Sequence, residues 1–159
     1  MSVLKTNRML QRHPAVRNAV VALICGLVIA ACGGPAATTP SPTVLAFAMT
    51  AQNRSAVSGT GDIVNGTDSF TLTIKLTGME AGSTHVSHVH AGRCAQPGGI
   101  VYNLQSVVAS SSGTATTVTT LPHAYLVPTS GWYVNVHFGP DFTEAEYAPS
   151  ISCGDLHPA

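Results

Sequence analysis

The stretch Phe70-Thr-Leu-Thr-Ile-Lys-Leu-Thr77 alternates apolar and polar residues without a break. Successive side chains of a β-strand point to opposite faces of the sheet, so every second residue shares a face. The four apolar residues of this stretch would therefore lie on one side, and the threonines and the lysine on the other. The pattern predicts a strand with one face in a core and one face in water.

The same period of two continues on both sides of this strand. Leu45, Phe47 and Met49 form an earlier apolar face. Further strand candidates are residues 56–64, 85–90, 101–107, 114–120 and 132–137, with a short one near Ile151. Turn-forming stretches separate them, namely VNGTD, MEAGS, QPGG, SSSG, VPTSG and FGPD. The sequence therefore predicts an all-β fold, a Greek-key antiparallel β-sandwich or barrel of about seven or eight short strands.

The beginning of the chain has a different character. Residues 1–17 carry four basic and no acidic side chains, and an apolar run over residues 19–31 ends at Cys32. This order is typical of a secretory signal, and the run is shorter than the roughly 20 residues that a membrane-spanning helix needs. The stretch Ile29-Ala-Ala-Cys-Gly33 resembles a bacterial lipobox, which implies cleavage before Cys32 and a diacylglycerol on its sulfur. An ordinary signal peptide with a coincidental cysteine is the alternative.

Three segments are therefore expected. Residues 1–31 would be a lipoprotein signal peptide, residues 32–42 a lipid-anchored tether rich in Gly, Pro and Thr, and residues 43–159 a single β domain. The expected location is the bacterial cell envelope, on the extracytoplasmic side of a membrane. The lipid on Cys32 would be the contact with that membrane.

Charge excludes some functions. The chain beyond Cys32 has three basic and seven acidic residues, a net charge of −4. A mildly acidic domain has no electrostatic footprint for nucleic acid and no basic patch for anionic lipid. The sequence also has no Gly-rich phosphate loop and no G-x-S-x-G nucleophile motif.

Two cysteines remain in the exported domain, Cys94 and Cys153. In an oxidising compartment an isolated pair of this kind predicts a disulfide. The bond would attach the loop after the histidine-rich segment to the last strand. The alternative is that the two thiols act as soft metal ligands.

The segment HVSHVHAGRC, residues 85–94, holds three of the six histidines that follow Cys32. His88 and His90 are two residues apart, so on a strand they share one face. Two imidazoles bind a metal weakly, and the segment Trp132-Tyr-Val-Asn-Val-His137 is the obvious strand to supply a third. Three neutral imidazoles suit Cu(II) or Zn(II), and the Irving–Williams order favours copper. The alternative is a polar strand face in water.

These segments resemble the copper–zinc superoxide dismutase family. KLTGMEAGSTHVSHVHAGRC matches the family's segment around its first histidines, and GTATTVTTL, WYVNVH and ISCGDL continue the likeness to about Leu156. The resemblance implies a Greek-key β-barrel and a disulfide between Cys94 and Cys153. It implies copper ligands at His88, His90 and His137, and for His85 a structural role beneath the copper.

The sequence also departs from that family. The interval AQPGGIVYN after Cys94 has no His and no Asp, so the family's zinc ligands and its bridging histidine have no counterpart here. Ser150 stands where the family has an arginine that guides superoxide. We therefore expect copper and no zinc site. The short loops in HVHAG, GGIVYNL and GWYVNVHFGP also resemble the chordin-type (CHRD) domain.

The sequence thus predicts an exported lipoprotein whose dismutase-like domain binds a single copper ion through three histidines and could act on superoxide. Two alternatives stay open: a non-catalytic module that exchanges copper with a partner, and a CHRD-like surface domain without metal. A net charge of −4 would slow the approach of superoxide. Arg93 is a candidate substitute for the guiding arginine. No catalytic residue is assigned, and turnover and oligomeric state stay open.

Overall fold

Strands account for most of the ordered structure in residues 43–159, the part of the chain that this computed structural model describes. The predicted signal peptide, Cys32 and the predicted tether lie outside the described residues. Between residues 43 and 159 there is no helix of the length and apolar character needed to cross a membrane.

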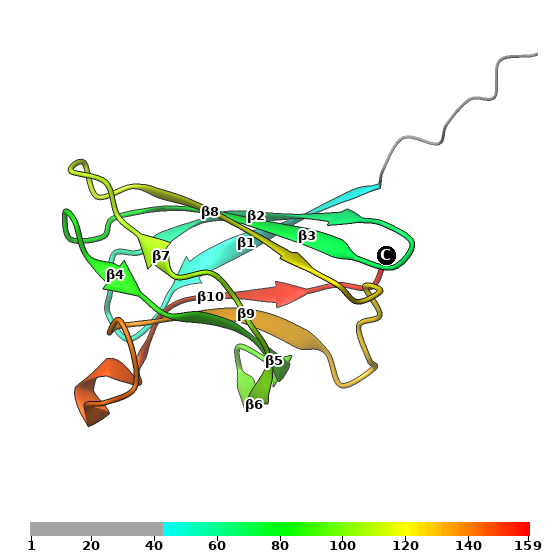
Figure 1. Ribbon diagram of the computed structural model, residues 1–159. Helices are drawn as coiled ribbons and strands as arrows, with labels where there is room; N and C mark the ends of the chain where they lie inside the picture. The colour runs from blue at the N-terminus through cyan, green and yellow to red at the C-terminus, as the bar shows by residue number, and fades with distance from the viewer. Residues whose placement is uncertain (1–42) are drawn as a thin grey trace, which may run out of the picture. The chain divides into compact units, whose positions relative to one another are not determined.

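Eight strands form one curled antiparallel sheet, in the order β6-β5-β9-β10-β1-β2-β3-β8 (Figure 1). Their bounds are β1 Val44–Ala51, β2 Ser58–Asn65, β3 Phe70–Thr77, β5 Ser87–Arg93, β6 Gln96–Asn103, β8 Ala115–Leu121, β9 Trp132–His137 and β10 Ser150–Leu156. Two short strands, β4 (Thr84–His85) and β7 (Val107–Val108), pair with each other, and one 3-10 turn covers Ala145–Tyr147. The prediction of an all-β fold is confirmed, and the curled sheet forms a half-barrel.

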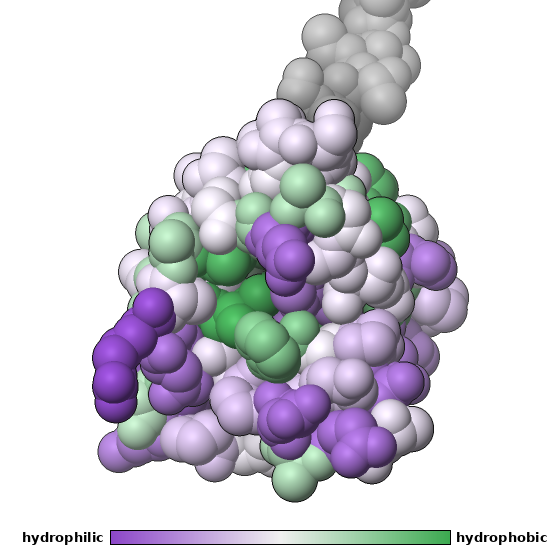
Figure 2. Space-filling view, turned by 90° about the vertical axis from the view of Figure 1, so that its left-hand side faces the viewer, coloured by the Kyte–Doolittle hydropathy of each residue, from purple (hydrophilic) through white to green (hydrophobic). Residues whose placement is uncertain are grey.

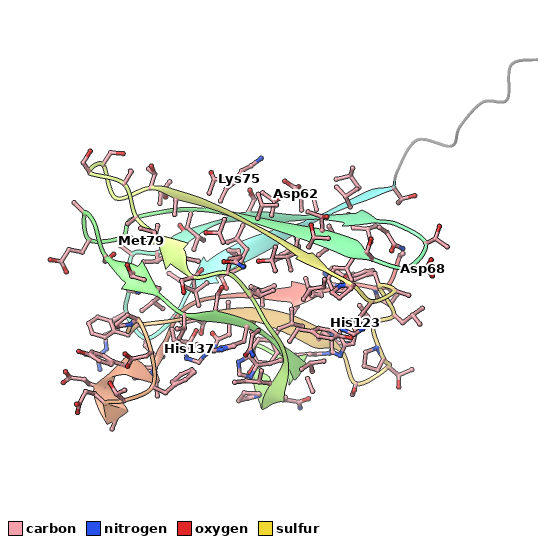
Figure 3. All side chains as sticks on the ribbon, in the orientation of Figure 1. Asp62, Asp68, Lys75, Met79, His123 and His137 are labelled. Atoms are coloured by element: carbon pink, nitrogen blue, oxygen red, sulfur yellow. A yellow bond between two sulfur atoms is a disulfide. The ribbon has the colours of Figure 1, made fainter. Side chains whose placement is uncertain are left out.

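The alternation that predicted β3 also explains its place in the sheet. Its four apolar side chains are at most 2 % exposed and belong to the core, while Thr73 and Lys75 face outward. On that outer face Lys75 Nζ lies 3.6 Å from Asp62 Oδ2 of the neighbouring strand β2 (Figure 3). Each buried apolar side chain of this size contributes about 1.5–3 kcal/mol relative to an exposed one.

The other half of the core comes from the strands that carry the histidines. Val89 of β5 and Val134 and Val136 of β9 are fully buried in the same cluster as the side chains of β3. Strand β9 was predicted at residues 132–137 and occupies those residues. Because the valines take the core side, every second residue of β5 and β9 lies on the outer side of the sheet.

The structure corrects one predicted turn. The stretch QPGG was expected to be a loop, but residues 96–99 form the first half of β6. Glycine makes this pairing feasible, because a Cβ atom on Gly98 would lie only 2.5 Å from the carbonyl oxygen of Ala91 on β5. The register between β5 and β6 shifts around His90, which identifies an irregular, bulged pairing. Sheet pairing here prevails over the local turn preference of Pro and Gly.

The predicted disulfide between Cys94 and Cys153 is present. Cys94 directly follows β5, and Cys153 lies in the middle of β10, with 5.9 Å between their Cα atoms. The Cys94 N–H group also donates a hydrogen bond of 2.7 Å to Asp155 Oδ1. The end of β5 is thus attached to the last strand by a covalent bond and a hydrogen bond.

Candidate metal centre

The site is built on two adjacent antiparallel strands, β5 and β9. Their register places His88 opposite Asn135 and His90 opposite Tyr133, all with side chains on the outer side of the sheet. His137, the last residue of β9, shares that side with Asn135 because the two are separated by two positions. Strand pairing therefore joins two histidines that are neighbours in sequence to a third that lies 47 positions after His90.

The three histidines His88, His90 and His137 form a compact buried cluster. Their exposed fractions are 6 %, 8 % and 6 %, and one ligand nitrogen from each lies within 4.8 Å of the others. Figure 3 shows His137 at the end of β9 beside β5. An ion with bonds of about 2.0–2.1 Å to imidazole nitrogen would require these atoms to move closer together. Three buried histidines at this separation could hold a metal ion.

In two of the three rings, hydrogen bonds determine which nitrogen carries the lone pair. His90 Nδ1 lies 3.0 Å from the carbonyl oxygen of Gly98, and His137 Nδ1 lies 2.6 Å from that of Ala148. A carbonyl oxygen only accepts, so both Nδ1 atoms carry hydrogen and both Nε2 atoms keep a lone pair in the neutral ring. The bulged strand β6 supplies one of these acceptors, which gives its unexpected conformation a role in the site.

Two ring nitrogens of the histidine cluster have no hydrogen-bond partner among the described residues. His88 Nδ1 and His90 Nε2 are both buried and make no hydrogen bond. A buried polar atom without a partner costs about 1–3 kcal/mol, so such atoms require an explanation. A metal ion bound to both lone pairs would provide one, and the donor set of three imidazole nitrogens fits a transition metal.

Burial favours the neutral form of two of the three histidines, His88 and His137. Desolvation, followed by the proximity of His137 and then of His90, lowers the pKa of His88 to about 4. Desolvation also lowers the pKa of His137, although its hydrogen bond to Ala148 acts in the opposite direction. At neutral pH these two rings therefore carry lone pairs and no charge, which is the form that binds metal.

His85 does not point into the cluster. Its Nδ1 lies 3.0 Å from the carbonyl oxygen of His137 and 2.7 Å from that of Phe138, and its Nε2 lies 2.8 Å from Ser83 Oγ. The ring thus connects the short strand β4 to the main chain at the end of β9. His85 can therefore position His137 through its backbone.

A cavity of about 600 Å³ lies beside His85. Its lining includes Met79, Phe138 and Ile151 beside His85, and none of the three clustered histidines. Figure 2, which shows this side of the molecule, has apolar atoms gathered in a hollow. Both ring nitrogens of His85 already have partners, so the histidine offers no free polar group to this cavity.

Two aromatic side chains that the sequence analysis did not select cover the cluster. Phe142 stacks on His88 with 5.4 Å between ring centroids and lies edge-on to His137 at 4.8 Å. Tyr133 stacks on His90 at 5.0 Å. Phe142 is 47 % exposed and comes from the loop after β9, so it forms the outer wall of the site. A molecule that reaches the cluster from the Phe142 side would have to displace this ring.

Two other histidines, His123 and His157, and the acid Asp141 lie outside the cluster. His123 is exposed and stacks on Tyr102, and Figure 3 shows it toward the opposite end of the strands from His137. His157 is exposed near the carboxyl end of the chain. The exposed carboxylate of Asp141 accepts hydrogen bonds from the backbone and hydroxyl of Thr143, which lower its pKa.

Fold and site together define a class: an all-β half-barrel domain with a buried three-histidine cluster that could hold a metal ion. No protein-family model matches the chain, and no curated protein matches it. The class therefore follows from the strand pairing and from the geometry of the histidines.

Proposed function

We propose that this domain binds a single copper ion through His88, His90 and His137. The observation that carries the proposal is the convergence of three buried imidazoles, two of which have a ring nitrogen without a hydrogen-bond partner among the described residues. Imidazole nitrogen binds both Zn(II) and Cu(II), and the Irving–Williams order places copper above zinc at such a site. Cys94 and Cys153, the two cysteines among the described residues, are joined in a disulfide, so neither offers a thiolate to the metal.

We infer from the motifs HVSHVH and WYVNVH that the domain is a reduced member of the copper–zinc superoxide dismutase superfamily with CHRD-like short loops. Copper in such a site would supply one-electron redox chemistry toward superoxide. The residues around it would orient the imidazoles through Gly98 and Ala148 and limit access through Phe142. A net charge of −4 beyond Cys32 and a phenylalanine over the site favour copper storage or exchange as the second candidate.

Superoxide consumption separates the two candidates. The copper-loaded protein is expected to consume superoxide faster than the same concentration of free copper if the site turns over, and His137→Ala should abolish the excess. A rate equal to that of free copper, together with retained copper binding, would exclude turnover of superoxide and favour copper storage or exchange. Pulse radiolysis gives the rates directly, and His123→Ala is the matched control because its ring is exposed and outside the cluster.

We also propose that the chain is anchored to a bacterial envelope membrane by lipid on Cys32. The lipobox-like stretch before this residue supports the proposal. The wild-type protein should be recovered with membranes and Cys32→Ser in the soluble fraction. Equal partition of both would contradict the anchor.

A further inference from the structure

Asn135 lies inside the candidate metal centre, although it is neither a histidine nor an acid. It is opposite His88 in the register of β5 and β9, and it is only 7 % exposed. Its side-chain nitrogen Nδ2 lies 3.2 Å from His137 Nε2. This amide is therefore placed at the nitrogen of His137 that would bind a metal.

The hydrogen-bond pattern gives the direction of that contact. His137 Nδ1 carries hydrogen because it faces the carbonyl oxygen of Ala148, so Nε2 accepts and the Asn135 amide N–H donates. A metal ion would bond to the same lone pair at about 2.0–2.1 Å. The amide N–H and the metal compete for one lone pair, so the amide nitrogen must leave this position when metal binds.

Ser150 makes a reversal of the amide feasible. Its hydroxyl donates to Asn135 Oδ1, and it also lies 3.3 Å from the carbonyl oxygen of Ser152. A hydroxyl can donate one hydrogen bond and accept others. After a half-turn of the amide, Asn135 Nδ2 would donate to Ser150 Oγ, and Ser150 would donate to Ser152. The reversal preserves the hydrogen bonding of this buried group and directs Oδ1 toward the cluster.

We propose that Asn135 is the fourth ligand of the metal held by His88, His90 and His137, through its Oδ1 atom. In the metal-free protein the same amide covers the lone pair of His137. This inference rests on the proposed copper-binding function and adds an oxygen to its three nitrogens. An amide oxygen is a harder ligand than imidazole and suits Cu(II) better than Cu(I). Asn135 therefore stabilises the oxidised ion in preference to the reduced one.

The test compares Cu(II) and Cu(I) affinities of the purified wild-type protein and of Asn135→Ala. The variant should lose about tenfold or more in Cu(II) affinity, at least as much as is lost when groups outside the ligand set are removed. Its Cu(I) affinity should change far less, and its Cu(II) EPR spectrum should shift through loss of an oxygen ligand. Asn135→Asp, which keeps an oxygen at the same place, should retain or exceed the wild-type Cu(II) affinity. Asn65→Ala, at the end of β2, is the matched control.

Each other outcome overturns the ligand role. Unchanged affinity and an unchanged EPR spectrum in Asn135→Ala would show that the amide does not bind the ion. An equal loss for both oxidation states would indicate a packing role, and tighter Cu(II) binding would make Asn135 only a competitor. In all three cases wild-type copper binding that depends on His137 leaves the proposed function intact. Failure of the proposed copper-binding function is distinguishable from failure of the ligand role, because the wild-type protein would then bind no copper at the cluster.

Discussion

Replacing both Cys94 and Cys153 by serine is expected to lower the free energy of unfolding by roughly 4 kcal/mol, because the bond closes a loop of 59 residues in the unfolded chain. A domain of this size has a total stability of only about 5–15 kcal/mol, so the loss is a large fraction of the whole. Urea unfolding followed by tryptophan fluorescence measures the effect, since Trp132 lies in the core.

Two comparisons make this prediction specific. The wild-type protein under reducing conditions should unfold like the double variant, because both lack the cross-link. The double variant is used because a single substitution would leave a free thiol that can form unintended bonds. A difference below about 1 kcal/mol between the oxidised wild type and the double variant would contradict the stabilising role that loop closure predicts.

Removing any one clustered histidine is expected to lower copper affinity by about 100-fold or more, a larger loss than the 10–100-fold typical of groups outside the ligand set. His90→Ala and His137→Ala each remove one of the three imidazole nitrogens. The two imidazoles that remain bind a metal weakly. Competition titration with a chelator of known affinity measures the change for each variant.

The controls for this prediction follow from the structure. His123→Ala and His157→Ala change the same residue type at exposed positions outside the cluster and should leave copper affinity unchanged. His85→Ala should produce a smaller loss than His137→Ala, because His85 reaches His137 through its main chain and lies outside the cluster. A loss spread equally over all of these histidines would indicate nonspecific surface binding and contradict the cluster.

Several features of the fold could be predicted because they depend on local pattern. The alternation in residues 70–77 and the segment 132–137 identified β3 and β9 with their bounds, and the cysteine pair identified the disulfide. The stretch QPGG was misread as a turn because its conformation is decided by pairing with β5, which a local pattern does not contain. Long-range strand pairing determines such positions.

The candidate site, like the fold, has residues that local sequence pattern predicts and residues that it does not. The spacing of His88 and His90 placed both on one face, the strand pattern of residues 132–137 suggested His137 as the third, and the resemblance to a known family implied the same three residues. Asn135 was missed although the same two-residue rule places it beside His137 on the outer face of β9. Phe142 could not be predicted, because its contact with His88 depends on how the loop after β9 folds back over the sheet.

The EPR spectrum of the purified protein with one equivalent of Cu(II) is the most direct test of the three-histidine copper site. We expect one tightly bound copper per chain and a single signal with hyperfine structure from imidazole nitrogens. The signal should be lost or replaced in His137→Ala and unchanged in His123→Ala. Weak, heterogeneous binding whose spectrum is the same in wild type and His137→Ala would contradict this site, and would mean that the three buried histidines serve only the structure of the domain.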